Sequence, residues 1–182
     1  MKNLAEILAK YETDKNIHSY IPVYEEIFSK FLGKEGMQFL EIGVLLGGTL
    51  LAWKDYFGEP ATIYGIDNWD RRKPEYISDR VKFINEDINK VNFRGHYWDI
   101  IIDDGSHLLE DVRFVVEAYI PFLKPGGYLI IEDVQHPVRW IGEIWQMIDH
   151  SKYTMDFIDG RHHKGHSEDF LIIIQRNADK NS

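Results

Sequence analysis

Hydrophobic and polar positions follow a helical pattern in the first part of the chain. The first apolar residues recur three or four positions apart: Leu4, Ile7, Leu8 and Tyr11. The stretch 21–32 repeats this spacing after a polar break. Because residues three and four apart lie on one face of a helix, residues 1–35 are expected to form an N-terminal helical segment.

Beyond residue 36 the apolar positions form short unbroken runs separated by helical stretches. The runs predict strands at 37–44, 61–67, 81–87, 98–104, 127–133, 153–159 and 170–176. Helical spacing recurs at 48–57, 108–123 and 138–148. Strands that alternate with helices predict a parallel sheet with helices on both faces. Unbroken apolar runs are typical of strands buried on both sides.

The last two strands are joined differently from the others. Only the ten polar residues of 160–169 separate them, and this length suits a hairpin better than a helical crossover. The final strand is therefore expected to run antiparallel to its neighbour. The sequence predicts one α/β domain over 1–182, whose core at 36–176 is a Rossmann-like, doubly wound, mainly parallel sheet with a C-terminal antiparallel strand.

Composition and charge narrow the range of functions. Of the 182 residues, 44% are hydrophobic and 28% charged, which is typical of a globular domain. The net charge of −9 argues against a nucleic-acid partner, because phosphates attract basic surfaces. The absence of cysteine excludes disulfides, zinc–thiolate sites and cysteine nucleophiles. No apolar run resembles a signal peptide or a membrane span, so a cytoplasmic location and no membrane partner are expected.

A glycine-rich loop, "LEIGVLLGGTL" at 40–50, joins the first core strand to its helix, where doubly wound folds bind nucleotides. The dinucleotide pattern G-x-G-x-x-G is incomplete after Gly43, and Glu41 stands where a pyrophosphate would lie. The pattern E-x-G-x-x-x-G-G, which ends at Gly47 and Gly48, suits instead a nucleoside with a positive centre and no phosphate. S-adenosylmethionine fits this description. The alternative is that the glycines only permit a tight turn and close packing.

Two acids strengthen the nucleoside interpretation. Asp67 ends the second core strand, where its carboxylate is placed to accept hydrogen bonds from both ribose hydroxyls. Asp87 ends the third strand, near the expected adenine edge. The residues expected to bind the cofactor are therefore Glu41, Gly43, Gly47, Asp67 and Asp87.

The chain resembles the class I S-adenosylmethionine-dependent methyltransferases, and among them the metal-dependent sugar O-methyltransferases of the macrolide and aminocoumarin antibiotic type. The resemblance rests on "TDKNIHSYIPVYEEIF" (13–28), "FLEIGVLLGGTLLAWKDYF" (39–57), "IYGID" (63–67), "WDIIIDDGSH" (98–107) and "LKPGGYLIIED" (123–133). It implies the class I methyltransferase fold. It also implies that Asp104, Glu132 and Asp133 bind a metal ion and that His107 is the catalytic base.

The position of these acids supports the implied metal site. Asp104 ends one strand, and Glu132 and Asp133 end the next, so neighbouring parallel strands bring all three to one edge of the sheet. Oxygen ligands select a hard cation, Mg²⁺, with Mn²⁺ or Ca²⁺ as alternatives. Such an ion would lower the pKa of a sugar hydroxyl, and His107 would accept its proton near neutral pH. Asp103 is expected to face the cofactor, with the cofactor's amino group as a partner.

Several side chains keep two interpretations. Asp103 or Ser106 is an alternative cap for the helix that follows. His162, His163 and His166 either are solvated or contact the substrate. His18, Tyr20 and Tyr24 either form a lid over the cofactor or pack the first helices on the sheet. Of Trp140 and Trp145, one is expected in the core and the other against a sugar ring.

The sequence therefore predicts an O-methyltransferase that uses S-adenosylmethionine and Mg²⁺ on a sugar hydroxyl of a glycoside or polysaccharide. Its partner is a small-molecule or saccharide acceptor, and a homo-oligomer is left open. A catechol-type O-methyltransferase is the nearest alternative, but that family has a lysine where His107 stands. A nicotinamide-dependent dehydrogenase is disfavoured by the incomplete glycine pattern. A non-catalytic nucleoside-binding module would not need three carboxylates and a histidine at one edge.

Overall fold

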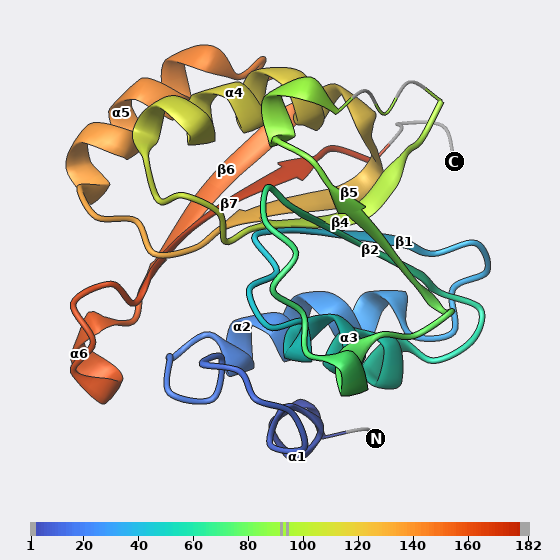
Figure 1. The fold of residues 1–182 in the computed structure, drawn as a ribbon. Helices are drawn as coiled ribbons and strands as arrows, with labels where there is room; N and C mark the ends of the chain where they lie inside the picture. The colour runs from blue at the N-terminus through green and yellow to red at the C-terminus, as the bar shows by residue number, and fades with distance from the viewer. Residues whose placement is uncertain (1–2, 92, 94, 179–182) are drawn as a thin grey trace.

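A seven-stranded sheet runs through the described residues, which are 3–91, 93 and 95–178 of the computed structural model (Figure 1). The strands are β1 (Gln38–Ile42), β2 (Thr62–Asp67), β3 (Val81–Asn85), β4 (Trp98–Asp103), β5 (Leu123–Ile131), β6 (Tyr153–Asp159) and β7 (Phe170–Arg176). Their order across the sheet is β3-β2-β1-β4-β5-β7-β6. The first five strands in this order, β3, β2, β1, β4 and β5, are parallel to one another. This arrangement confirms the predicted doubly wound sheet.

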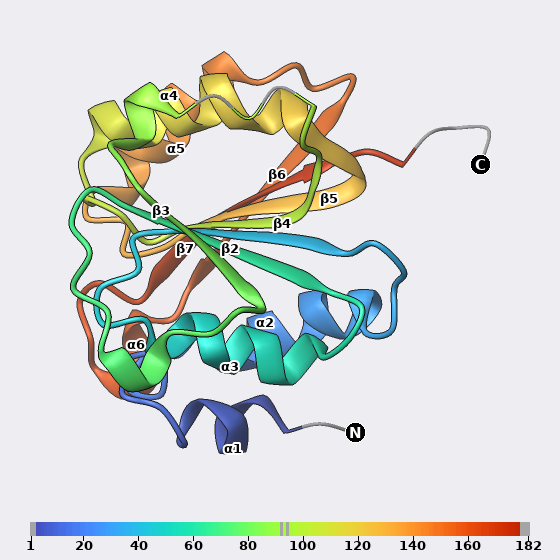
Figure 2. The same cartoon turned by 45° about the vertical axis from the view of Figure 1, so that its right-hand side comes forward.

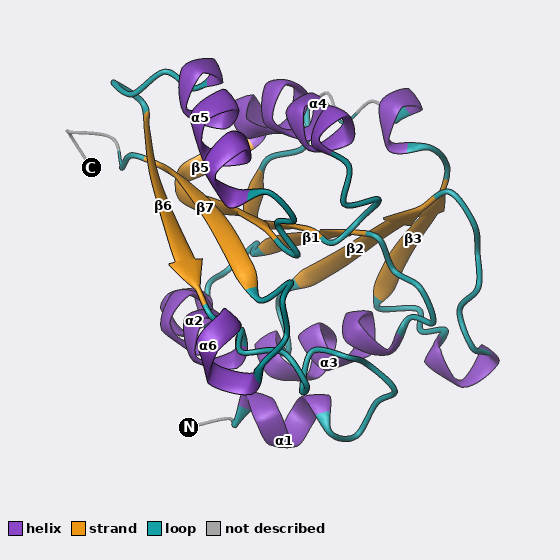
Figure 3. Cartoon of the chain, turned by 90° about the vertical axis from the view of Figure 1, so that its left-hand side faces the viewer, coloured by secondary structure: helices purple, strands orange, loops and turns teal. Residues whose placement is uncertain are grey.

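The helices form one layer on each face of the sheet (Figure 2). They are α1 (Leu4–Leu8), α2 (Ile21–Phe28), α3 (Gly48–Phe57), α4 (Leu109–Tyr119), α5 (Pro137–Met147) and α6 (Arg161–Lys164). The first three cover one face, and α4 and α5 cover the other. The single turn of α6 lies in the β6–β7 connection, beside the N-terminal segment (Figure 3).

Each face of the sheet has its own apolar core, because the strands carry large side chains on both sides. Phe28, Phe39 and Trp53 belong to the core beneath α1–α3. Trp98 and Trp140 belong to the core beneath α4 and α5. Trp140 is 2% exposed and Trp145 is 50% exposed, so the prediction that one of these two tryptophans is in the core is confirmed.

The order of the strands creates a crevice beside β1. The chain leaves β1 toward β2 and β3, and then returns to the other side of β1 as β4 and β5. Ile42, the last residue of β1, pairs with Ile66 on one side and Asp103 on the other. The loops that follow β1 and β4 therefore diverge, and such a switch point is where open α/β sheets bind ligands.

The C-terminal hairpin agrees with its sequence pattern. β7 pairs antiparallel with both β5 and β6, as expected from the short connection at 160–169. That connection is held against the N-terminal segment, because Lys164 Nζ donates to the backbone carbonyls of Asn16 and His18 at 2.8 Å each.

One boundary differs from the prediction. The helix expected to reach residue 123 ends at Tyr119, and a 3₁₀ turn follows at Ile120–Phe122. Pro121 explains the change, because proline has no backbone N–H to continue an α-helix. The chain enters β5 directly afterwards, at Leu123 instead of residue 127.

None of the helices in the described part of the chain has the length and apolar character that crossing a membrane requires.

Candidate active site

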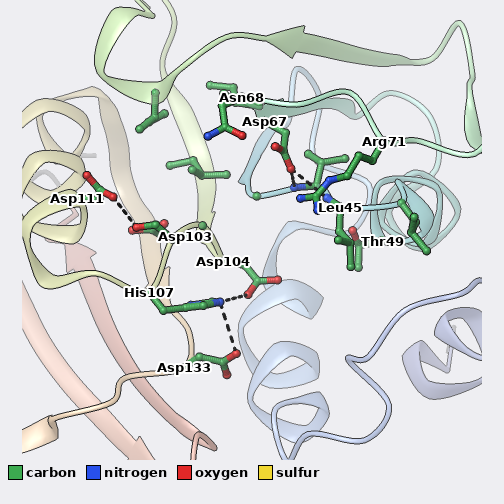
Figure 4. Close-up of a pocket in the computed structure, with 18 of the residues that line it drawn as sticks. Leu45, Thr49, Asp67, Asn68, Arg71, Asp103, Asp104, His107, Asp111 and Asp133 are labelled. Carbon is green, nitrogen blue, oxygen red and sulfur yellow. Dashed lines mark hydrogen bonds and ion pairs between the residues drawn. The ribbon is translucent and has the colours of Figure 1, made fainter.

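A cavity of about 560 Å³ opens at the carboxyl ends of the central strands (Figure 4). This volume is in the range of small-molecule sites. Loops after four strands contribute to it: 42–46 after β1, 66–68 after β2, 86–89 after β3 and 103–107 after β4. Glu12, Thr13 and Asp14 from the N-terminal segment also line it. The cavity thus occupies the crevice that the strand order creates.

The glycine-rich loop passes directly over the chain at Asp104. Gly43 has φ +85°, and a Cβ added to it would lie 2.0 Å from the backbone oxygen of Asp104. Both the left-handed backbone and the close approach therefore require glycine here. Gly43 lines the cavity, whereas Gly47 does not. Gly47 precedes α3 with φ +87°, so the turn interpretation describes it better than the binding one.

Asp67 and Asp87 both line the cavity, as the nucleoside interpretation expects. Asp67 also shapes the glycine loop: its Oδ2 accepts from the backbone N–H groups of Val44 at 2.9 Å and Leu45 at 3.1 Å. Asp87 is half-buried, and its Oδ1 accepts from the backbone N–H of Asn89 at 2.9 Å. The structure brings these two predicted residues to the same cavity.

Glu41 lies away from this cavity. It is fully buried and its Oε2 accepts from the Thr49 hydroxyl at 2.8 Å. Thr49 lines the cavity, and Glu41 does not. Burial raises the pKa of Glu41 to about 7, although Lys15 and Thr49 oppose the shift. The structure therefore places Glu41 behind Thr49 instead of against a ligand.

Asp103 faces the cavity from the end of β4. Its Oδ2 is buried without a hydrogen-bond partner among the described residues. Burial is the main cause that raises the pKa of Asp103 to about 7. The alternative role as a helix cap is wrong, because the N-cap residue of α4 is Leu108 and no side chain caps it. A buried acceptor that faces a cavity fits a ligand with a polar hydrogen.

Asp103 should make the stability of the protein depend on pH. The pKa of Asp103 rises from 3.8 in the unfolded chain to about 7 in the folded protein. Its ionisation therefore lowers the free energy of unfolding as pH rises from about 4 to about 7, and the loss stays constant above pH 7. Asp103→Asn should therefore raise the free energy of unfolding at about pH 8 and change it little at about pH 4. Urea unfolding at several pH values measures this, with the exposed Asp79→Asn as control. An equal difference at all pH values would contradict the prediction.

The predicted metal ligands Asp104, Glu132 and Asp133 lie together, and each also accepts a hydrogen bond from a side chain of the N-terminal segment. Lys15 Nζ donates to Asp104 Oδ2 and to Glu132 Oε2, at 2.5 Å each. Glu132 Oε1 accepts from the Tyr24 hydroxyl. Burial opposes the charged form of Lys15, but Asp104 and Glu132 outweigh it and raise the pKa of Lys15 above its ordinary value. Glu132 is 2% exposed and does not line the cavity.

Asp104, His107 and Asp133 form a compact group at the cavity (Figure 4). His107 Nε2 lies 3.9 Å from Asp104 Oδ1 and 3.9 Å from Asp133 Oδ2. One potential ligand atom from each residue lies within 4.8 Å of the others. Asp133 is also held by Tyr20, whose hydroxyl donates to its Oδ1 at 2.5 Å. The two carboxylates thus have one oxygen each on the side of His107.

The backbone at this group is unusual. His107 has φ +54° and Asp133 has φ +52°, in the left-handed region that few residues other than glycine adopt. Such conformations cost energy and cluster at functional sites. Here they turn the side chains of both residues toward Asp104.

The N-terminal segment contributes more than the sequence indicates. Lys15 was not among the expected site residues, because a lysine in a polar stretch carries no local signal of burial. Tyr20 and Tyr24 neither line the cavity nor act only as packing, since they donate to Asp133 and Glu132. Their spacing of four residues was the available signal, since it places both on one face of a helix.

Four other histidines lie in or against the β6–β7 connection. His18 Nδ1 lies 2.6 Å from Asp169 Oδ1, and the His166 ring is 5.4 Å from that of His18. His162 and His163 on α6 are exposed, which agrees with the solvated alternative. None of these four residues is among those that line the cavity within the described chain.

Comparisons with known proteins agree with this geometry. A family model for a methyltransferase domain matches residues 40–134. The mycinamicin VI 2''-O-methyltransferase of Micromonospora griseorubida is 33% identical over 147 residues, which cover 72% of this chain and 36% of that protein. The 8-demethyl-8-alpha-L-rhamnosyl tetracenomycin-C 2'-O-methyltransferase of Streptomyces olivaceus is 30% identical over 183 residues, with 88% and 46% covered. The chain spans less than half the length of these relatives.

Solved structures show the same fold. MycE methyltransferase from the mycinamycin biosynthetic pathway, in complex with Mg and SAH, matches with a TM-score of 0.76 and 25% identity over 100% of this chain and 56% of that one. The O-methyltransferase TomG from Streptomyces achromogenes, in complex with SAM, matches with a TM-score of 0.64 and 14% identity. The match covers 98% of this chain and 91% of the TomG chain. Since the family model covers 40–134 of the 182 residues, this chain belongs to the methyltransferase domain family.

Proposed function

We propose that this domain transfers a methyl group from S-adenosylmethionine to a sugar hydroxyl, with a divalent cation bound beside the acceptor. The observation that carries the proposal is one cavity that joins the glycine loop to the group of Asp104, His107 and Asp133. Two similar proteins support the sugar acceptor, since their names describe O-methylation of a mycinamicin and of a rhamnosyl tetracenomycin. The cytoplasmic location expected from the sequence stays a prediction.

The cavity fits S-adenosylmethionine, which supplies an electrophilic methyl group when bound. Asp67 and Asp87 line the cavity and would accept hydrogen bonds from ribose and adenine. Gly43 lets the loop that lines the cavity pack directly against the backbone of Asp104. The unpartnered Oδ2 of Asp103 offers an acceptor for an amino group. Gly47 and Glu41 would act indirectly, by shaping the loop and supporting Thr49.

Asp104, Glu132 and Asp133, which we call the acidic group, fit a divalent cation. The cation would supply Lewis-acid chemistry that lowers the pKa of the acceptor hydroxyl. Asp104 Oδ1 and Asp133 Oδ2 are the carboxylate oxygens on the side of His107. Mg²⁺ is commonly held by one or two carboxylates with waters. Glu132 stays a predicted third ligand: each of its oxygens accepts one hydrogen bond, and a carboxylate oxygen has two lone pairs.

His107 is the proposed general base. Its Nε2 faces the two carboxylates, so an acceptor hydroxyl held between them would have its proton within reach of this nitrogen. Neutral imidazole would accept that proton as the oxygen attacks the methyl group. The bond between the methyl carbon and sulfur would break at the same time, and its electron pair would leave with S-adenosylhomocysteine. The acids then stabilise the imidazolium that forms, through opposite charge.

A panel of acceptors tests the substrate class directly. The protein would be incubated with S-adenosylmethionine carrying a labelled methyl group, with Mg²⁺ and with simple glycosides, oligosaccharides or catechol. Transfer to glycosides or oligosaccharides is the expected result. Transfer to catechol alone would overturn the sugar assignment and favour the catechol-type alternative.

The cofactor site predicts a specific loss of affinity. Asp67→Ala should weaken binding of S-adenosylhomocysteine by about 1.5–3 kcal/mol, the typical contribution of hydrogen bonds to a charged group. Calorimetry measures this. Asp70→Ala is the matched control, because Asp70 is exposed, pairs with Arg72 and does not line the cavity. Binding of a nicotinamide dinucleotide, without binding of S-adenosylhomocysteine, would contradict the proposed function.

A further inference from the structure

A buried lysine lies between two of the predicted metal ligands. Lys15 is 1% exposed and contacts Asp104 and Glu132, which are 89 and 117 residues away in the sequence. Lysine is almost never fully buried unless it is paired. One of these ion-pair partners, Asp104, lines the cavity, and the other, Glu132, lies behind it. The lysine therefore joins the site to the buried acid behind it.

Lys15 offsets part of the negative charge of this site. Asp104, Glu132 and Asp133 carry three negative charges when ionised, and a divalent cation would offset two of them. The Lys15 ammonium offsets the third. Its position is specific, because it contacts Asp104 through Oδ2 and leaves Oδ1 on the side of His107. A buried charge that loses its partner is strongly destabilising, so Lys15 and these acids depend on one another.

Lys15 also belongs to a segment that forms a wall of the cavity. We call residues 12–20 the N-terminal strap. Its residues 12–14 line the cavity, and Lys15 itself does not. The backbone N–H of Glu12 donates to the Tyr76 hydroxyl at 2.8 Å, and that of Ser19 donates to Asp169 Oδ2 at 2.8 Å. Lys15 anchors the strap between these two points.

We propose that Lys15 is a positioning residue: its ammonium ties the N-terminal strap to Asp104 and Glu132, and so holds the wall of the cofactor cavity and the acidic group in one arrangement. The inference rests on the proposed function for the identity of the cofactor. Lys15 acts through residues 12–14 on the cavity and through Asp104 on the acidic group. Through these contacts Lys15 would couple cofactor binding to the arrangement of Asp104 and Glu132.

Lys15→Met tests this, because methionine keeps most of the side-chain volume and removes the charge. In the presence of a chelator, the affinity for S-adenosylhomocysteine should fall about tenfold if the strap is closed in only a tenth of the molecules. Hydrogen exchange should accelerate at the backbone amides of Glu12, Ile17 and Ser19, which are hydrogen-bonded in the strap. Amides of α5, on the opposite face of the sheet, should keep their protection.

Two further variants separate positioning from general stability. Lys10→Met makes the same change at an exposed lysine five residues earlier, and should alter neither affinity nor exchange. Lys15→Met combined with Glu132→Gln removes the unpaired charge of Glu132. The double variant should melt at a higher temperature than Lys15→Met. Its strap should still exchange fast, because the anchor is still missing.

The outcomes distinguish this inference from the proposed function. Wild-type protein that does not bind S-adenosylhomocysteine would overturn the proposed function, while exchange in the strap would still decide the role of Lys15. Wild-type exchange rates and affinity in Lys15→Met would overturn the positioning role. A double variant that regains strap protection and affinity along with its melting temperature would also overturn it, because Lys15 would then act only through stability.

Discussion

Replacing His107 by asparagine is expected to lower turnover about 10²- to 10⁴-fold, the usual contribution of a general base. Affinity for S-adenosylhomocysteine should be nearly unchanged, because His107 Nε2 faces Asp104 and Asp133. Asparagine is the informative replacement here: His107 has φ +54°, and asparagine tolerates this left-handed backbone better than alanine does. The loss then reports on the imidazole and not on the backbone.

The same experiment has a built-in test of a structural role. His163→Asn, at an exposed position on α6, is the control for the substitution itself. A packing role for His107 predicts a lower melting temperature with normal turnover per folded molecule. Normal turnover in His107→Asn across the pH range would show that another group accepts the proton from the acceptor hydroxyl.

Removal of divalent cations is expected to abolish methyl transfer without unfolding the protein. The two apolar cores are built from hydrophobic side chains of the strands and helices, and the members of the acidic group are not among them, so circular dichroism should be unchanged in chelator. Added Mg²⁺ should restore activity. Asp133→Asn should behave like chelated protein even in excess Mg²⁺, since it removes one of the two carboxylates beside His107.

Asp133 is a cleaner position for this test than Asp104, which also holds Lys15. Asp156→Asn is a suitable control, because Asp156 is an exposed acid on β6. Direct titration of Mg²⁺ into each variant gives a second readout that is independent of turnover. Full activity of the wild type in chelator would remove the Lewis-acid role and leave the acids as partners of Lys15, Tyr20 and Tyr24.

The sequence was informative wherever local pattern decides structure. Continuous apolar runs located the strands, and the parallel topology then placed the residues after β4 and β5 at one edge. Asp104 and Asp133 could be predicted as neighbours for this reason. The contacts of Lys15 could not, because they join residues 89 and 117 positions apart and depend on how the N-terminal strap crosses the edge of the sheet.

Glu41 and Glu132 show a second limit of the sequence. Both are acids at strand ends, and the pattern assigned both to the site. In the structure each has its own buried partners, Thr49 for Glu41 and Lys15 with Tyr24 for Glu132. Successive residues of a strand point to opposite faces. A shift of one position along the strand therefore separates a residue that lines the cavity from one that lies behind it.

The close approach of Gly43 to the Asp104 carbonyl constrains any redesign of this domain. Because an added Cβ would lie 2.0 Å from that oxygen, a side chain at position 43 would displace the backbone of Asp104, and the glycine loop would shift with it. Cofactor preference and metal chemistry therefore cannot be re-engineered independently through this loop. A library that varies the acceptor range should therefore keep residue 43 fixed.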